Sequence, residues 1–382
     1  MIIQSRNVWY RNSFQPLQLE LNGSRISRIL PYGEKKSMLD YGDAFIIPGF
    51  IDVHTHGGYG CDCLLADPQG LRQWITKLPE EGVIGFLPTI AAAPQADILQ
   101  AVQNIRSVSE ARIRGAYVLG IHLEGPWLNQ AYAGAQPPAF IRQPDTQELD
   151  QYIQASGNMI RLVTLAIEND TDSRFTEYCR SRNIIVSVGH SAASIEEVAE
   201  ARKHGLQSVT HTFNRQSPLH HRHPGVTGAA LRFHDMYAEI ITDMHHVAED
   251  AVNIFYTCKD QDHAVMITDS LLCKGMPAGT ITDFAGQRIV LAEDGCAYLS
   301  GTDTLAGSTL RFDEGLRNVI EKAGVDPARA IRSCTVNPAA MLGLDDHLGL
   351  IEEDYDADLC ITDQHFLVTD CYVKGNLLFH KS

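Results

Sequence analysis

The sequence predicts an α/β protein: a (β/α)8 TIM barrel with a small β-sandwich-like domain formed from both chain ends. The middle of the chain alternates short apolar runs with helical patterns, which is typical of βαβ units and a parallel sheet. Both ends consist of strand-like runs and turns. The length of 382 residues suits a barrel of roughly 250–300 residues with a smaller unit attached.

The two chain ends are expected to form one small sheet domain. Alternation from Leu17 to Glu20, a tight turn at Asn22-Gly23 and a second run from Ile26 to Leu30 predict a hairpin near the start. Near the other end, residues 357–361 and 371–373 are strand-like. The predicted divisions are residues 1–48 and 345–382 for the small β domain and residues 49–344 for the barrel.

Eight apolar runs are expected to form the strands of the barrel. A capping box at Ser194-Ile195-Glu196-Glu197 opens one intervening helix, and Gly205 ends it. After the eighth run, alternation around residues 288–291 and 297–299, within the long segment 271–309, predicts a hairpin in the loop. Barrels of this kind place their chemistry where the strands end. The runs are Ile46–Val53, Ile84–Leu87, Tyr117–Leu123, Arg161–Ala166, Ile184–Val188, Ser208–Thr210, Ala238–Thr242 and Ala264–Thr268.

Composition excludes several partners. The formal net charge is -16 and no Lys/Arg-rich run occurs, which argues against nucleic acid. An anionic ligand would therefore need local positive charge from Arg, His, a metal or backbone amides. Neither a signal peptide nor an apolar run of about 18 residues is found, so no membrane span is expected. Nine irregularly spaced cysteines predict free thiols and a cytoplasmic protein.

Five of the eight predicted strands end in a potential metal ligand. Imidazole and carboxylate groups together suit Zn, Fe, Ni or Mn. Taken singly, a histidine after a strand is more often a structural hydrogen-bonding residue. Because all these groups fall at the same end of successive strands, they predict one metal site at one mouth of the barrel. The candidates are the pair His54 and His56, then Glu124, His190, His211 and Asp269.

Several of these segments resemble the N-acetylglucosamine-6-phosphate deacetylases and their N-acetylgalactosamine-6-phosphate relatives in the amidohydrolase superfamily. The run Pro48–Gly57 is similar to the opening of the superfamily. The H-L-E-G-P segment at residues 122–126 and the L-A-G-S segment at residues 305–308 make the resemblance specific. Order and spacing hold from about residue 45 to residue 340. Further matching segments are residues 189–191, 211–214, 219–225 and 267–269.

The resemblance implies hydrolysis of the acetamide of an N-acetylhexosamine 6-phosphate by a metal-dependent enzyme. It assigns Asp269 as the catalytic residue, which takes a proton from the attacking water and delivers it to the departing amine. The cofactor is one divalent ion or two, with Zn or Fe as the first candidates. The implied ligands are Glu124, His190 and His211, with His54 and His56 as a second site that some members have and others lack.

The resemblance also implies substrate contacts and a homodimer in which Arg222 reaches the neighbouring site. Three departures surround the sugar position: Gln136 stands where the family usually has His, Arg215-Gln216 stands where it usually has a small residue and Met, and His223 replaces an acidic residue. They leave the metal ligands and Asp269 intact. The implied substrate-binding residues are Ala135, Gln136, Asn214, Arg215, Arg222 and His246.

Other functions remain open. The alternative enzyme is another amidohydrolase-superfamily amide or cyclic-amide hydrolase with a different substrate. Many of those use a carboxylated Lys after the fourth strand, whereas this chain reads Leu165-Ala166-Ile167-Glu168. A binding or regulatory protein descended from an enzyme is a further reading, against which the complete ligand set argues. A purely structural protein fits the sequence least.

Overall fold

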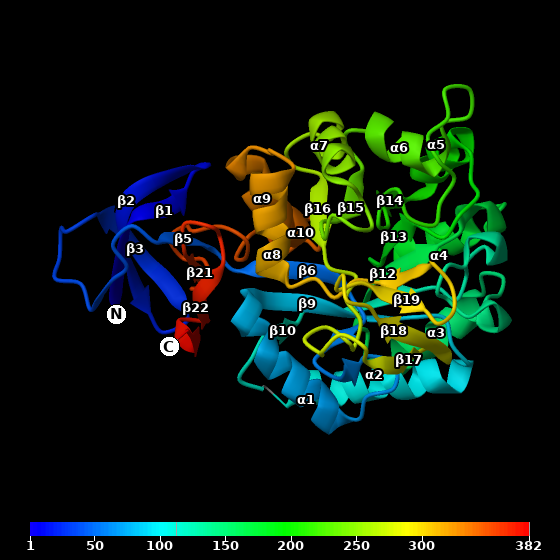
Figure 1. Cartoon of the computed structure of the whole chain (residues 1–382), viewed down its shortest axis with the longest axis horizontal. Helices are drawn as coiled ribbons and strands as arrows, with labels where there is room; N and C mark the ends of the chain where they lie inside the picture. The colour runs from blue at the N-terminus through cyan, green and yellow to red at the C-terminus, as the bar shows by residue number, and fades with distance from the viewer. Residues whose placement is uncertain (112, 382) are drawn as a thin grey trace.

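The computed structural model describes residues 1–111 and 113–381. Strands from both ends of the chain form one sheet, which lies beside a parallel barrel surrounded by helices (Figure 1). The larger hydrophobic core fills the barrel and the space under its helices, and the end sheet has a smaller core of its own.

Eight parallel strands follow one another around the barrel in chain order. The first strand pairs with the second, and after the last strand the N–H of Asp269 donates to the carbonyl of His54 in the first (2.9 Å). This contact nearly closes the barrel, and the predicted fold class is confirmed. The strands are β6 (Phe50–Thr55), β9 (Val83–Ile90), β11 (Ile121–Glu124), β12 (Ile160–Leu165), β13 (Ile185–Val188), β14 (Leu206–Val209), β15 (Tyr237–Ile241) and β16 (Ala264–Ile267).

Two of the predicted strands are each broken in two. The run 46–53 divides at Gly49 into an end-sheet strand, β5 (Phe45–Pro48), and β6 of the barrel. A Cβ at Gly49 would lie 2.4 Å from Ile84 Cγ2, so only glycine fits between the two units. The run 117–123 divides into β10 (Tyr117–Val118) and β11 at Gly120, where a Cβ would lie 2.2 Å from Arg161 Cγ. The apolar pattern continues through both positions, so it predicts one strand where the structure has two.

Helices alternate with the barrel strands. The capping box at the start of α5 is present, with Ser194 Oγ accepting from the N–H of Glu197 (3.2 Å) and Glu197 Oε2 accepting from the N–H of Ser194 (2.7 Å). None of the described helices is both long and apolar enough to cross a membrane. The α-helices are α1 (Pro68–Lys77), α2 (Gln95–Glu110), α3 (Thr146–Ala155), α4 (Arg174–Ser181), α5 (Ile195–His204), α6 (Gly225–Arg232), α7 (Glu249–Cys258), α8 (Phe312–Arg317), α9 (Pro327–Cys334) and α10 (Val336–Met341). Short helical turns are η1 (Leu78–Glu81), η2 (Gln130–Tyr132), η3 (Pro138–Phe140), η4 (Ile167–Asn169) and η5 (Asn318–Lys322).

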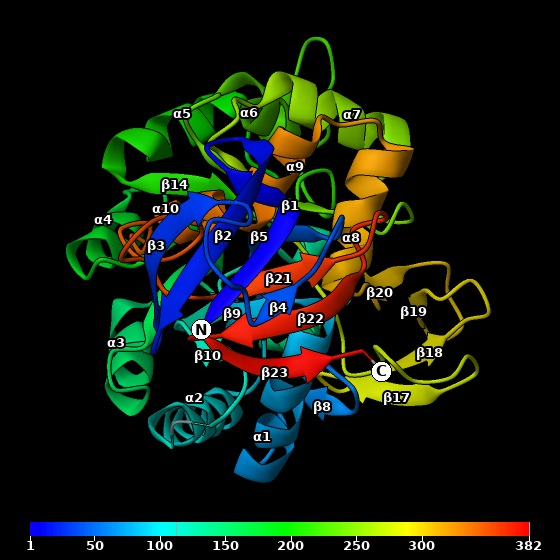
Figure 2. The same ribbon diagram turned by 90° about the vertical axis from the view of Figure 1, so that its left-hand side faces the viewer.

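The end sheet joins the two termini through β5, which pairs with β1 on one side and β21 on the other. Its strand order is β23-β22-β21-β5-β1-β2-β3, with β4 beside β1, and Figure 2 shows both termini on this sheet. The division of the chain at residues 48 and 344 stays a prediction. The strands are β1 (Ile2–Tyr10), β2 (Ser13–Asn22), β3 (Arg25–Pro31), β4 (Leu39–Asp40), β21 (Leu359–Thr362), β22 (Val368–Val373) and β23 (Asn376–His380).

A second antiparallel sheet extends the loop after β16 (Figure 2). The predicted hairpin is its central pair, and one further strand lies on each side. A two-stranded ribbon follows β6, directly after the His54 and His56 segment. The strands of the extension are β17 (Ile281–Phe284), β18 (Gln287–Leu291), β19 (Ala297–Leu299) and β20 (Leu305–Gly307), and those of the ribbon are β7 (Gly57–Gly58) and β8 (Cys61–Asp62).

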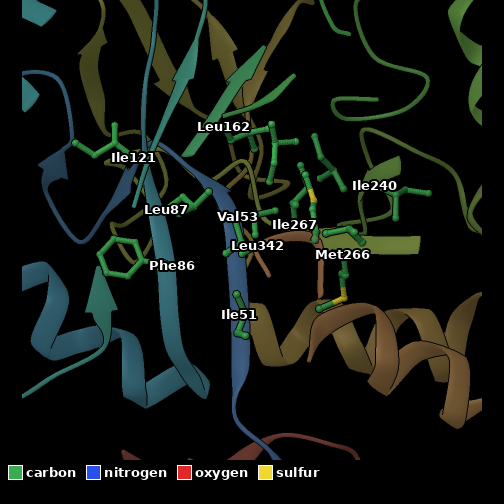
Figure 3. Close-up of a cluster of buried hydrophobic side chains, with 14 of the residues drawn as sticks. Ile51, Val53, Phe86, Leu87, Ile121, Leu162, Ile240, Met266, Ile267 and Leu342 are labelled. Atoms are coloured by element: carbon green, nitrogen blue, oxygen red, sulfur yellow. The ribbon is translucent and has the colours of Figure 1, made fainter. Parts of the chain in front are cut away.

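Side-chain alternation along β6 separates core from site. Ile51 and Val53 are fully buried among apolar side chains from neighbouring strands and from Leu342 (Figure 3). Asp52 and His54, one residue further along in each case, face the opposite side of the strand. The same strand therefore contributes to the hydrophobic core and to the polar mouth of the barrel.

Candidate metal centre and substrate pocket

Three candidate ligands hold the same position relative to their strands. His190, His211 and Asp269 each lie two residues beyond the end of β13, β14 or β16. All three adopt a left-handed backbone conformation, with φ of 47°, 29° and 48°. Such conformations are uncommon for residues other than glycine, and they recur at active sites and ligand-binding turns. The turns that follow these strands are therefore shaped for side-chain placement rather than for ease of chain reversal.

Glu124, at the end of β11, lies at the centre of the cluster. Its Oε1 is 3.0 Å from His190 Nε2 and 2.9 Å from His211 Nε2. Its Oε2 is 3.0 Å from His56 Nε2. The side chain is only 3% exposed, so these imidazoles replace water around the carboxylate. One buried carboxylate thus contacts imidazoles from three different strands.

The six predicted metal residues form two neighbouring groups. In each group the potential ligand atoms all lie within 4.8 Å of one another, close enough to share one ion. Asp269 Oδ1 is 3.4 Å from His54 Nε2 and 3.3 Å from His56 Nε2, and Glu124 of the other group reaches His56 Nε2 with its Oε2 (3.0 Å). The structure therefore brings together residues more than 200 positions apart in the chain. The H-x-H triad is His54, His56 and Asp269, and the central triad is Glu124, His190 and His211.

Three of the four imidazoles have a hydrogen-bond acceptor at Nδ1. Each of these acceptors is a carboxylate or a backbone carbonyl, so it holds a proton on Nδ1 and leaves the Nε2 lone pair free. That arrangement is typical of histidines that bind metal through Nε2. The contacts are His54 Nδ1 with Glu239 Oε2 (2.9 Å), His56 Nδ1 with the carbonyl of Thr89 (3.1 Å) and His190 Nδ1 with the carbonyl of Tyr132 (2.8 Å).

The resulting set of atoms fits a cation. Nε2 lone pairs and carboxylate oxygens face one another at about 3 Å, where acceptors repel unless a proton or a positive ion lies between them. His190 Nε2 and His211 Nε2 are themselves only 3.1 Å apart. Nε2 of His54 is buried and has no hydrogen-bond partner among the described residues. Imidazole and carboxylate donors in this number suit a divalent transition metal.

The pKa values of these groups reflect the same excess of acceptors. Burial disfavours the charged imidazole of His54, but facing carboxylates, Asp269 first, outweigh burial and raise its pKa well above the usual value. Burial likewise opposes the charged form of His56, yet hydrogen bonds to Asp269 and Glu124 raise its pKa to about 9. Burial favours a neutral Glu124, but the charges of His54 and His190 hold its pKa well below the usual range. A metal ion held among these groups would supply the positive charge that the facing carboxylates favour.

A cavity of about 520 Å³ opens directly above the ligands. This volume suits a small ligand such as a substituted sugar. Its polar wall includes five of the six predicted substrate residues, and its remaining wall comes partly from Phe284 and residues 303–307 of the β17–β20 extension. The five are Ala135, Gln136, Asn214, Arg215 and His246.

Arg222 is the predicted substrate residue that lies elsewhere. It borders a separate hollow beside the start of α5, together with His220 and His223. Its Nη1 is 2.9 Å from His221 Nε2 within the same exposed loop. The structure therefore does not bring Arg222 to the cavity of its own chain.

Two cationic groups border the cavity. His246 Nδ1 is 2.6 Å from Asp243 Oδ2; burial opposes the charged imidazole, but this contact raises the pKa of His246. Arg215 is exposed, and its side chain crosses Gly134, where a Cβ would lie 2.9 Å from Arg215 Cγ. Arg215 and His246 thus offer local cationic groups at the cavity of an acidic protein, as an anionic ligand would require.

Sequence patterns did not reveal the residues that support the ligands. Glu239 is fully buried on β15 and holds His54, and its signal in the sequence is a single acidic residue within an apolar run. Glu168 accepts from Ser191 Oγ (2.6 Å) and from the N–H of Ala192 (2.6 Å), so it anchors the turn that carries His190. Glu168 also occupies the segment after β12, where the alternative enzymes carry a lysine.

Comparison with known proteins agrees with this geometry. The profile of the Amidohydrolase family matches residues 45–378. N-acetylglucosamine-6-phosphate deacetylase from Bacillus subtilis is 36% identical over 342 residues, covering 88% of this chain and 85% of the relative. N-acetylgalactosamine-6-phosphate deacetylase from Escherichia coli is 35% identical over 332 residues, covering 87% of each chain.

Solved structures agree as well. A mutant of N-acetyl-D-glucosamine-6-phosphate deacetylase from Mycobacterium smegmatis, in complex with N-acetyl-D-glucosamine-6-phosphate, superposes with a TM-score of 0.94 at 27% identity and covers 99% of both chains. The N-acetylglucosamine-6-phosphate deacetylase from Thermotoga maritima gives a TM-score of 0.89 at 28% identity over 100% of both chains. This chain therefore belongs to the amidohydrolase family, in the group of N-acetylglucosamine-6-phosphate and N-acetylgalactosamine-6-phosphate deacetylases.

Proposed function

We propose that this protein is a metal-dependent deacetylase that hydrolyses the acetamide of an N-acetylhexosamine 6-phosphate, releasing the amino-sugar 6-phosphate and acetate. The observation that carries the proposal is the meeting of two ligand triads, one of which includes Asp269, beneath one cavity. The relatives at 35–36% identity are named for this reaction on two epimeric sugars.

The central triad and the H-x-H triad are the ligand sets for one divalent ion or two. Glu124 belongs to the central triad and also contacts both histidines of the H-x-H triad, His56 through Oε2 (3.0 Å) and His54 through Oε1 (3.6 Å). Zinc and iron are the first candidates because both accept imidazole and carboxylate ligands. A divalent ion held here supplies Lewis-acid chemistry, because it polarises a carbonyl group and makes water more acidic.

Asp269 is the proton carrier. No residue of the described chain forms a hydrogen bond with its Oδ2, whereas both oxygens of Glu124 are engaged by imidazoles or by Gln136. Asp269 also lines the cavity, so its carboxylate can reach a substrate. It takes a proton from water as the new C–O bond forms at the acetyl carbon. It then gives that proton to the nitrogen as the C–N bond breaks, because an unprotonated amine leaves poorly.

The substrate phosphate binds at the cationic edge of the cavity. Asn214, Arg215 and His246 border this edge, and a guanidinium offers phosphate a two-pronged hydrogen-bonding surface. Arg222 acts across the interface of a homodimer, in the cavity of the neighbouring subunit. Its position outside the cavity of its own chain supports that assignment.

The protein is cytoplasmic. Its nine cysteines are all free thiols and eight of them are buried, which fits a reducing compartment. No strongly basic surface is expected from a net charge of -16, so nucleic acid is not a partner.

A deacetylation panel on the metal-loaded protein tests the proposal. The panel holds the 6-phosphates of N-acetylglucosamine, N-acetylgalactosamine and N-acetylmannosamine, with the unphosphorylated sugars as controls, and acetate release is measured. We expect turnover of at least one 6-phosphate, much slower turnover of its unphosphorylated analogue, and none after chelation. Cleavage of cyclic amides or N-acylamino acids without any cleavage of the 6-phosphates would favour the alternative enzyme.

A further inference from the structure

Gln136 is held between a backbone group and a metal ligand. Its side chain is 2% exposed and lies in the loop after β11. Its Oε1 accepts a hydrogen bond from the N–H of Ala92 (2.7 Å), and its Nε2 donates to Oε2 of Glu124 (2.5 Å). Both ends of the amide are therefore engaged inside the protein.

The two contacts fix the orientation of the amide. The backbone N–H of Ala92 can only donate, so the amide oxygen must face it. The amide nitrogen consequently faces Glu124 and donates to it. A rotation of the amide by 180° would place a donor against a donor and an acceptor against a carboxylate, and both contacts would be lost.

Glu124 therefore has a different set of neighbours on each oxygen. Oε1 faces His190 and His211 of the central triad at about 3 Å and His54 Nε2 at the longer distance of 3.6 Å. Oε2 faces His56 and receives the hydrogen bond from Gln136. A carboxylate with contacts to imidazoles alone could turn about its terminal bond, because imidazoles lie on both sides. The fixed amide of Gln136 selects one orientation.

We infer that Gln136 is a positioning residue that sets the rotation of Glu124, so that Oε1 keeps its closest contacts with His190 and His211 while Oε2 faces His56. The inference rests on the proposed metal-dependent function, since it assigns Glu124 to metal binding. Gln136 acts through Glu124 and carries no charge, so it orients the ligand without adding a titrating group to the site.

Gln136→Met tests this role, with Gln216→Met as a matched control. Methionine is unbranched and of similar length, but it cannot donate to Glu124. Gln216 lines the same cavity and is 5% exposed, yet its Nε2 donates to Thr227 Oγ1 (3.3 Å) and not to a ligand. Zn²⁺ affinity is measured for each metal-depleted full-length protein by competition with a chromogenic chelator, and the visible spectrum of the Co²⁺-loaded protein is recorded.

We expect Q136M to bind Zn²⁺ about 10- to 100-fold more weakly than the parent and to change the Co²⁺ spectrum, because support of a metal ligand is lost. Q216M should bind Zn²⁺ within about twofold of the parent, with an unchanged spectrum. Unchanged affinity and spectrum in Q136M, or an equal loss in Q216M, would overturn the inference. If Q136M does not fold, Gln136→Asn replaces it with the same expectations, since the shorter amide cannot reach both partners.

The readout separates this inference from the proposed reaction. Zn²⁺ binding and the Co²⁺ spectrum require no substrate. If the variants behave as expected but no acetylated sugar phosphate is cleaved, the role of Gln136 stands and the proposed function fails. If the parent deacetylates and Q136M binds both ions as the parent does, the function stands and the inference fails.

Discussion

At the scale of single residues, two buried carboxylates with shared neighbours have different tasks. Glu124 contacts imidazoles through both oxygens and is held by Gln136. Asp269 contacts His54 and His56 through Oδ1 alone and borders the cavity. The carboxylate with one oxygen left for substrate is the one suited to proton transfer, and the enclosed carboxylate is the one suited to hold a cation.

Asp269→Asn should lower kcat by about 100- to 10,000-fold, because an amide cannot carry the proton from water to the amine. The central triad does not include Asp269, so folding and the ion of that triad should be retained. Steady-state kinetics, metal analysis and circular dichroism measure these three properties. Full activity in the variant would refute the assigned role, and loss of the fold would leave Asp269→Glu to separate charge from position.

Phosphate recognition is the second prediction at this scale. Arg222→Ala and Arg215→Ala should each raise KM for the 6-phosphate by roughly tenfold or more, and far less for the unphosphorylated sugar, because a charge-assisted contact is removed. Equal effects on both substrates would remove either arginine from the phosphate site.

A mixing experiment locates Arg222. When R222A and D269N subunits are combined, a shared site can contain Asp269 from one chain and Arg222 from the other. Low-KM activity should then appear, although neither variant has it alone. If Arg222 served its own subunit, the mixture would show only the high KM of R222A.

At the scale of elements, the β17–β20 extension forms one wall of the cavity. Phe284 of β17 is 3% exposed and meets the ring of His56 edge-on, with centroids 5.1 Å apart. Residues 303–307, which include β20, continue the same wall. The extension after the last barrel strand thus both lines the cavity and packs against a candidate ligand.

Phe284→Ala should lower kcat/KM for the 6-phosphate by roughly three- to tenfold, because the aromatic contact with His56 and part of the wall are lost. Ile281→Ala is the matched control, since Ile281 lies on the same strand with its side chain 52% exposed. Its kcat/KM should stay within about twofold of the parent. An equal loss of kcat/KM in both variants would contradict a specific role for the Phe284 side chain.

At the scale of the whole molecule, the end sheet and the barrel meet at a buried acid. Asp358 Oδ1 accepts from the N–H of Lys374 in the end sheet (2.6 Å) and from the hydroxyl of Tyr117 in β10 (3.1 Å). Burial raises the pKa of Asp358 to about 7, above the value of about 3.9 for an unfolded chain. Folding therefore favours the protonated form of Asp358 at this contact between the end sheet and the barrel.

Asp358 should make the free energy of unfolding depend on pH. Because the folded pKa is raised, the contribution of Asp358 is fully present below about pH 4 and is lost as pH rises toward about 7. Urea unfolding of the parent and of Asp358→Asn near about pH 5 and about pH 8 measures it. Between these two pH values, the free energy of unfolding of the parent should fall by on the order of 2 kcal/mol more than that of the variant. If the free energy of unfolding changes equally with pH in the parent and in Asp358→Asn, then Asp358 makes no pH-dependent contribution to stability.

The amino-acid pattern alone is enough to predict the fold class, the shared sheet of the two chain ends and the candidate ligands. Period-two alternation and turn residues act locally, so the hairpin of β2 and β3 and the capping box of α5 are readable from a few residues. Parallel strands in a barrel share one polarity, so residues that follow them must meet at one mouth. For this reason, the sequence alone predicts that His190, His211 and Asp269 lie at one site.

The contacts that orient those side chains can be read only from the folded structure. The strand breaks at Gly49 and Gly120 depend on Ile84 and Arg161 from other strands, which no local pattern contains. The contacts of Gln136 with Ala92 and Glu124 depend equally on loops that are distant in sequence. The physical reason is range: periodicity and turn chemistry act over a few residues, whereas the orientation of a buried polar group is set by partners that folding brings to it.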